Sequence, residues 1–82
     1  MGDDPEQSRH RAQITQNNLG NALRSLGERE SGTARLEEAV AAYGNALAVF
    51  APALADHYVG VTRQNLARAQ AIIAKRQTEA AP

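Results

Sequence analysis

The chain lacks cysteine and tryptophan, has only two tyrosines and one phenylalanine, and has no excess of charge of either sign. Without cysteine, neither a disulfide framework nor a thiolate zinc site can form. The nine basic and nine acidic residues cancel at pH 7, whereas nucleic-acid-binding domains carry a basic excess. We therefore expect no nucleic-acid partner.

Long hydrophobic runs are also missing. No uninterrupted run of hydrophobic residues exceeds six, far short of the roughly 20 that a membrane-spanning helix needs. The beginning of the chain lacks the apolar stretch of a secretory signal peptide. We therefore expect a cytoplasmic protein that does not contact membranes.

What the chain has in quantity is alanine. Of its 35 hydrophobic residues 17 are alanines, which favour helix and leave only 18 larger side chains for a core. A core of this size leaves no room for a large enclosed active site. No serine lies in a nucleophile elbow, no glycine-rich loop could cradle phosphate, and His10 and His57 lack a third ligand at helical spacing. We expect no catalysis, no metal and no cofactor.

The spacing of apolar residues predicts three helices. Pro5 suits a first helical position, Gly27 suits a left-handed helix end, and Pro52 disfavours helix in the residue before it. Lys75 and Arg76 would then lie in the last turn of the third helix, where positive charge suits the helix dipole. We expect a disordered N-terminus at 1–4, one unit with helices at about 5–27, 33–50 and 52–76, and a frayed tail at 77–82.

Apolar side chains recur at helical spacing in the first two segments, which predicts one buried face on each. The face expected for the first helix consists of Ala12, Thr15, Leu19, Ala22, Leu23 and Leu26. The face expected for the second consists of Leu36, Val40, Tyr43, Leu47 and Phe50, flanked by Ala39, Ala42 and Ala46. Small side chains let helices approach closely, so we expect the second helix to lie between two neighbours.

The first and third segments repeat each other at an offset of 47 residues. The identical pairs are Pro5/Pro52, His10/His57, Thr15/Thr62, Asn18/Asn65, Leu19/Leu66 and Ala22/Ala69. The third helix therefore looks like a second copy of the first, and the second helix is the partner of both. This predicts an all-α chain of the order A–B–A′, a helical hairpin plus a third helix.

These residues resemble the tetratricopeptide repeat, a family of stacked helical hairpins. The resemblance lies in the Leu-Gly-Asn-Ala-Leu of residues 19–23, in the Leu-Gly of residues 26–27, in Ala39, Tyr43 and Ala46, and in Pro52 near the repeat's closing proline. About seven extra residues after Gly27 lengthen the usual 34-residue repeat, as in extended bacterial repeats, and the third helix resembles a C-terminal cap. The resemblance implies a fragment of a right-handed α-solenoid.

Amides and arginines form a second stripe beside the expected packing face. In the resembled family, the corresponding positions line a concave groove that binds peptides. The resemblance thus implies a ligand groove formed by Asn17, Asn21, Arg24, Gln64 and Arg68. Amides can donate to and accept from a peptide backbone, and arginines can pair with carboxylates. The alternative interpretation is a solvated face, or amides that cap neighbouring turns.

One and a half repeats are fewer than the roughly three that such arrays normally need. We therefore expect self-association, with a homodimer favoured, through the face formed by Val40, Tyr43, Leu47 and Phe50. The expected function is a non-catalytic protein-interaction module that presents a helix-lined groove or an apolar helix face to a peptide or partner protein. The alternative is a self-assembling structural unit, domain-swapped or engineered, with no dedicated ligand.

Overall fold

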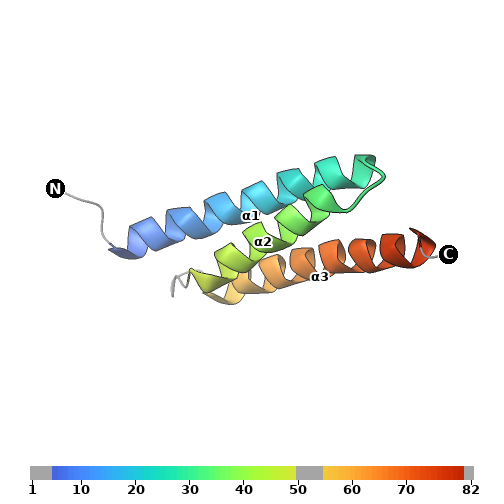
Figure 1. The fold of residues 1–82 in the computed structure, drawn as a ribbon. Helices are drawn as coiled ribbons and strands as arrows, with labels where there is room; N and C mark the ends of the chain where they lie inside the picture. The colour runs from blue at the N-terminus through green and yellow to red at the C-terminus, as the bar shows by residue number, and fades with distance from the viewer. Residues whose placement is uncertain (1–4, 50–54, 81–82) are drawn as a thin grey trace.

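Three helices make up the part of the chain that this computed structural model describes, residues 5–49 and 55–80. They are α1 (Pro5–Arg29), α2 (Ala34–Ala48) and α3 (Ala55–Ala80). α1 and α2 form an antiparallel hairpin, and α3 packs along α2, while α1 and α3 touch each other only sparsely (Figure 1). α2 therefore has a neighbour on each side, and the expected all-α class with a helical hairpin plus a third helix is confirmed.

The core is built around α2. The fully buried side chains of α2 are Leu36, Ala39, Tyr43 and Ala46, and Ala42 is almost completely buried. Ala69 of α3 joins the cluster, and Leu23 of α1 and Leu66 of α3 pack against it from either side. The alternation of small and large residues on α2 lets both neighbours approach closely.

Two glycines of α1 make room for the two large buried side chains of α2. A Cβ atom at Gly20 would lie 2.5 Å from Cε1 of Tyr43, and one at Gly27 would lie 2.8 Å from Cγ of Leu36. Gly27 is buried and helical, so it serves close packing and does not end α1, which continues to Arg29. The expected helix end at Gly27 is therefore wrong, and no glycine in the described ranges has a positive φ angle.

The face of α1 that packs against α2 is not the expected one. Four residues of the predicted packing face are exposed, namely Thr15, Leu19, Ala22 and Leu26. The buried residues of α1 are instead Gln13, Asn17, Gly20 and Gly27. The reason is steric, because only a face with glycines can accept the Tyr43 ring and Leu36 against the helix backbone, where they make many close contacts. Leu19 and Leu26 consequently remain 46% and 51% exposed.

The second and third helices also differ from their expected bounds. α2 begins at Ala34 and ends at Ala48, slightly inside the predicted range 33–50. α3 begins at Ala55 and continues to Ala80, so the tail predicted at 77–82 is helical through residue 80. The predictions for residues 1–4, 50–54 and 81–82 fall outside the described residues.

Arg76 does not have the place at a helix end that the sequence predicts for it, because α3 continues to Ala80. Its side chain does not serve the end of its own helix but reaches across to the carboxyl end of α1 and the loop that follows. Nη1 donates to the carbonyl oxygens of Gly27 at 2.6 Å and Gly32 at 2.7 Å, and Nη2 donates to that of Glu28 at 3.1 Å. The guanidinium thus bonds two carbonyls in the last turn of α1, of which that of Gly27 also accepts from Glu30 N at 3.2 Å, and one carbonyl of the loop that follows.

Replacing Gly20 by alanine should destabilise the chain. Alanine favours helix by about 1 kcal/mol over glycine, but overpacking against Tyr43 should outweigh that gain and lower the free energy of unfolding by about 1–2 kcal/mol. Gly44→Ala is the matched control, because a Cβ there meets nothing within 4 Å, and it should stabilise by about 0.5–1 kcal/mol. Urea unfolding followed by circular dichroism measures both; equal stability of the two variants would contradict the packing described here.

Replacing Arg76 by alanine should lower the free energy of unfolding by about 1–3 kcal/mol, because three carbonyls lose a charged donor. Lys75→Ala is the control, since Lys75 is the neighbouring exposed cation of α3 and its loss should change stability by less than about 0.5 kcal/mol. Hydrogen exchange of the loop amides around Gly32 gives a local readout. Unchanged exchange in Arg76→Ala would show that this side chain does not hold the loop.

Candidate functional site

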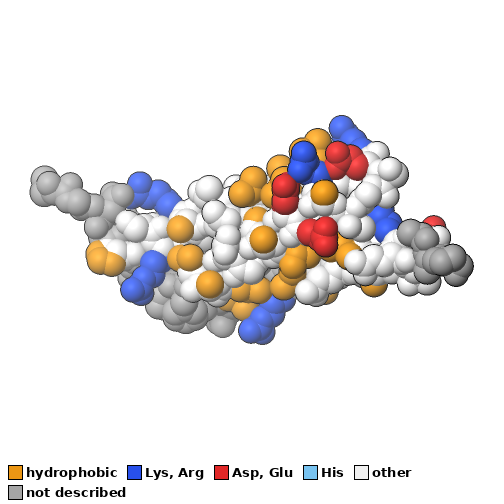
Figure 2. All heavy atoms as spheres, in the orientation of Figure 1, with side chains coloured by type: hydrophobic (Ala, Val, Ile, Leu, Met, Phe, Trp, Pro, Cys, Tyr) orange, Lys and Arg blue, Asp and Glu red, His pale blue; other side chains and the backbone are white. Residues whose placement is uncertain are grey.

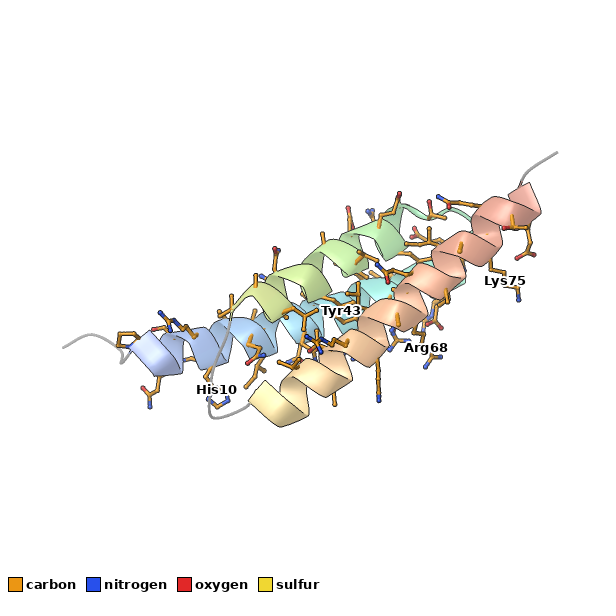
Figure 3. The ribbon with its side chains drawn as sticks, turned by 90° about the horizontal axis from the view of Figure 1, so that it is seen from below. His10, Tyr43, Arg68 and Lys75 are labelled. Atoms are coloured by element: carbon orange, nitrogen blue, oxygen red, sulfur yellow. The ribbon has the colours of Figure 1, made fainter. Side chains whose placement is uncertain are left out.

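The candidate site lies on the side of the molecule where α1 and α3 flank Tyr43. Figure 3 shows Tyr43 near the centre of the three helices, Arg68 projecting outward from α3, and His10 and Lys75 toward opposite ends. The two repeat-related helices each contribute side chains to this side, and α2 contributes the tyrosine beneath them. A ligand here would contact equivalent turns of α1 and α3.

The hydroxyl of Tyr43 organises the α1 side of the site. It donates to Oδ1 of Asn21 at 2.7 Å and accepts from Nε of Arg24 at 3.3 Å. The bond to Tyr43 raises the pKa of Arg24 above its ordinary value; burial opposes this rise and Glu28 adds to it. Arg24 is therefore a permanently charged group held in a defined position.

One carboxylate stands between arginines of two helices. Oε1 of Glu28 accepts from Nη1 of Arg24 at 2.8 Å, and Nε of Arg68 lies 4.0 Å from the same oxygen. The Arg24 side chain is 16% exposed, whereas that of Arg68 is 64% exposed. The site therefore presents two cations around the carboxylate of Glu28: Arg24, which is largely buried and held by hydrogen bonds, and Arg68, which is mostly exposed.

Asn17 does not line an open groove. It is 5% exposed, and its Oδ1 accepts a hydrogen bond of 3.0 Å from the hydroxyl of Thr62, which is fully buried. Asn17 therefore joins α1 to α3 inside the molecule, which corrects its expected place among ligand-contacting residues. A polar pair of this kind fixes the register between the two repeat-related helices.

Two further polar residues, Gln13 and Thr62, are buried near Asn17, and the sequence pattern did not predict their burial. Gln13 lies one turn before Asn17 and is 1% exposed, and its Oε1 has no hydrogen-bond partner in the described structure. Thr62 was visible only as one half of a repeated pair. The four-residue spacing of Gln13 and Asn17 was the available signal, but polar residues on one helix face normally indicate solvent.

The remaining predicted residues are divided between surface and core. Gln64 is exposed one turn before Arg68, so it extends the α3 side of the site. Of the expected self-association face, Tyr43 has no exposed surface, Val40 packs against the core cluster and Leu47 is half-buried. Phe50 lies outside the described residues. Tyr43 therefore belongs to the chain's own core rather than to a face for a second copy.

Two surface hollows lie between neighbouring helices, and neither is lined by Arg24 or Arg68. One of about 380 Å³ lies between α1 and α2 and is lined by Gln16, Leu19 and Leu23 together with Glu38, Ala41 and Ala42. Another of about 240 Å³ lies between α2 and α3, beside Val40 and Ile73. Figure 2 shows hydrophobic side chains spread over this view and acidic ones gathered toward the end where α1 and α2 join.

The side chains of the site can form hydrogen bonds and ion pairs with a ligand. Among the described residues, no three side chains of His, Asp or Glu come together in a way that could hold a metal ion. None of the helices in the described ranges has the length and apolar character required to cross a bilayer. The arginines and the amide of Asn21 can bind carboxylates and peptide carbonyls.

No known protein family, curated protein or solved structure matches this chain. The resemblance to the tetratricopeptide repeat therefore stays a prediction that rests on the motif residues alone.

Replacing Thr62 by valine should lower the free energy of unfolding by about 1–3 kcal/mol, because Oδ1 of the buried Asn17 loses its donor. Thr78→Val is the control, since its exposed hydroxyl bonds only Ala74 O of its own helix, and it should cost less than about 0.5 kcal/mol. Adding Asn17→Leu to Thr62→Val should cost less than the sum of the single changes. Additive losses would show that the two side chains do not interact.

Proposed function

We propose that this chain is a non-catalytic protein-interaction module of tetratricopeptide type that binds an acidic peptide segment on the face formed by α1 and α3. One observation carries the proposal: Glu28 of the chain itself places a carboxylate between Arg24 and Arg68. A carboxylate from a peptide has the same chemistry and can take its place. A cytoplasmic location is part of the same proposal.

The bound carboxylate of Glu28 is easy to displace. The Glu28 side chain is 35% exposed, and ion pairs at that exposure contribute only about 0–1 kcal/mol. Arg68 makes only a 4.0 Å contact and keeps most of its surface in solvent, so its planar guanidinium can form a two-point bond with an incoming carboxylate. Intramolecular competition by Glu28 would set the affinity for the peptide.

Asn21 supports recognition of the peptide backbone. Its Oδ1 is engaged by the Tyr43 hydroxyl, which fixes the orientation of the amide. The amide nitrogen then has two protons to donate to peptide carbonyls. An extended peptide could therefore place a carboxylate on the arginines and a carbonyl on Asn21, and Gln64 would extend the contact along α3.

Self-assembly is the second candidate, and a homodimer stays an expected state of this chain. Its support is weaker because Tyr43, at the centre of the expected face, is fully buried within a single chain. A partner of different sequence therefore fits the observations better than a purely structural role.

Replacing Glu28 by glutamine should strengthen binding of acidic peptides, because the internal competitor loses its charge. The probes are fluorescein-labelled peptides of about 12 residues rich in Asp and Glu, together with the same peptides carrying Asn and Gln. We expect Glu28→Gln to tighten binding of the acidic set by about three- to tenfold in fluorescence anisotropy, and Arg68→Gln to weaken it by at least fivefold. The peptides with Asn and Gln in place of Asp and Glu should bind neither variant.

Arg63→Gln is the control for charge alone. Arg63 is exposed on α3 five residues before Arg68, which places it about 140° around the helix. It should change the affinity less than twofold at a physiological salt concentration, where distant charges are screened. Equal effects of Arg63→Gln and Arg68→Gln, or no binding of any acidic peptide to Glu28→Gln, would contradict the proposal.

A further inference from the structure

The internal repeat relates the exposed apolar side of α1 to a buried side of α3. We call the exposed residues Thr15, Leu19, Ala22 and Leu26 the outer stripe of α1. At the 47-residue offset, their counterparts on α3 are Thr62, Leu66, Ala69 and Ile73. Three of the four pairs are identical, and the fourth exchanges leucine for its isomer isoleucine.

The paired residues are more deeply buried on α3 than on α1. On α3, Thr62 and Ala69 are fully buried, and Leu66 packs against the core cluster that contains Ala39 and Tyr43 of α2. On α1, all four residues of the outer stripe are exposed. In the α3 stripe, Leu66 and Ala69 thus pack against α2 and Thr62 bonds Asn17 of α1. The outer stripe of α1 has similar chemistry, and none of the described helices of this chain lies upon it.

A groove continues from the outer stripe onto the hairpin interface. The hollow between α1 and α2 is lined by Leu19 and Leu23 on one side and by Ala41 and Ala42 on the other. A helix seated on the outer stripe would therefore also contact the small residues of α2. The interface would be continuous with the α1–α2 packing inside the chain.

The lack of unpaired charges on the outer stripe and groove determines which side chains an incoming helix can present there. Between residues 12 and 27 the only ionisable side chain is Arg24, which is engaged with Tyr43 and Glu28 on the other side of α1. On α2, the Glu38 carboxylate at the groove is paired with Arg35 at 3.1 Å. A charged stripe on an incoming helix would lose water without gaining a counter-charge, so the complementary stripe is uncharged.

The face of α3 that corresponds to the α2-packing face of α1 cannot bind a second helix like α2. The α2-facing residues Gly20 and Leu23 of α1 correspond to Ala67 and Gln70 of α3. A Cβ at the Gly20 position meets the Tyr43 ring, so Ala67 lacks the space that an equivalent tyrosine would need. In addition, the α2 surface that matches the outer stripe is already covered by α3. A second copy therefore cannot offer the face of α2 that carries Ala39 and Tyr43, because α1 and α3 bury it.

From these observations we infer that the outer stripe of α1 and the adjoining groove bind an α-helix of a different protein. That helix carries an uncharged stripe with small, aliphatic and aromatic residues in the spacing of Ala39, Val40 and Tyr43 of α2. This surface is separate from the arginines of the proposed peptide site. The inference therefore goes beyond the proposed function and can fail independently of it.

The test uses the full chain and a helix whose fit is known from the fold. The probe is a fluorescein-labelled peptide with the sequence of residues 33–49, covalently bridged between positions 41 and 45 to hold it helical, which reduces the ordering cost of binding. Fluorescence anisotropy should show saturable binding to the wild-type chain. The same peptide with Val40→Lys and Tyr43→Lys should not bind.

Two variants of the chain locate the contact. Leu19→Gln combined with Leu26→Gln should weaken binding of the bridged peptide at least tenfold, with unchanged helicity because both side chains are exposed. Val61→Gln is the matched control, since Val61 is the other large hydrophobic residue exposed in the described chain, and it should change binding less than twofold. The double leucine variant should keep its affinity for acidic peptides, and Arg68→Gln should keep its affinity for the bridged peptide.

Three results would overturn the inference. One is a bridged peptide that does not bind the wild-type chain, and another is equal binding to the double leucine variant, which would mean that the peptide replaces α2 within the fold. The third is concentration-dependent self-association of the wild-type chain in sedimentation that the double leucine variant abolishes. That result would identify a second copy as the occupant.

Discussion

The packing of Tyr43 against Gly20 is the contact on which the other features of this structure depend. The ring is fully buried, and even a methyl group at position 20 would overlap it. Leu36 repeats the arrangement two turns away at Gly27. Together the two contacts determine how close α1 and α2 lie and which side of α1 faces the core.

That orientation has two consequences on opposite sides of α1. On one side it brings Asn21 and Arg24 to the Tyr43 hydroxyl, so that a charged and oriented pair faces Arg68 of α3 with Glu28 between them. On the other side it leaves Leu19 and Leu26 half exposed in a stripe free of charge. A polar binding face and an apolar one therefore arise from the same rotation of one helix.

Much of the architecture could be predicted from the sequence. Helical spacing and the 47-residue repeat predicted three helices with α2 as the common partner, because periodicity and repetition are properties of the chain alone. The buried face of α1 could not be predicted in this way. Counting apolar residues favoured Leu19 and Leu26, whereas the decisive feature was the space beside Gly20 and Gly27, which depends on the shape of α2. Asn17 and Arg76 were misplaced for a related reason, since their partners, Thr62 and the carbonyls near Gly27, come from distant parts of the chain.

The most direct test of the account is a nuclear Overhauser measurement on the chain in solution. The ring protons of Tyr43 should show strong cross-peaks to the α protons of Gly20, because a gap without a side chain brings them into contact. The methyl groups of Leu26 should show none to α2. A Tyr43 ring without cross-peaks to Gly20, together with Leu26 methyls in contact with α2, would mean that α1 packs through its leucines and would contradict the central claim.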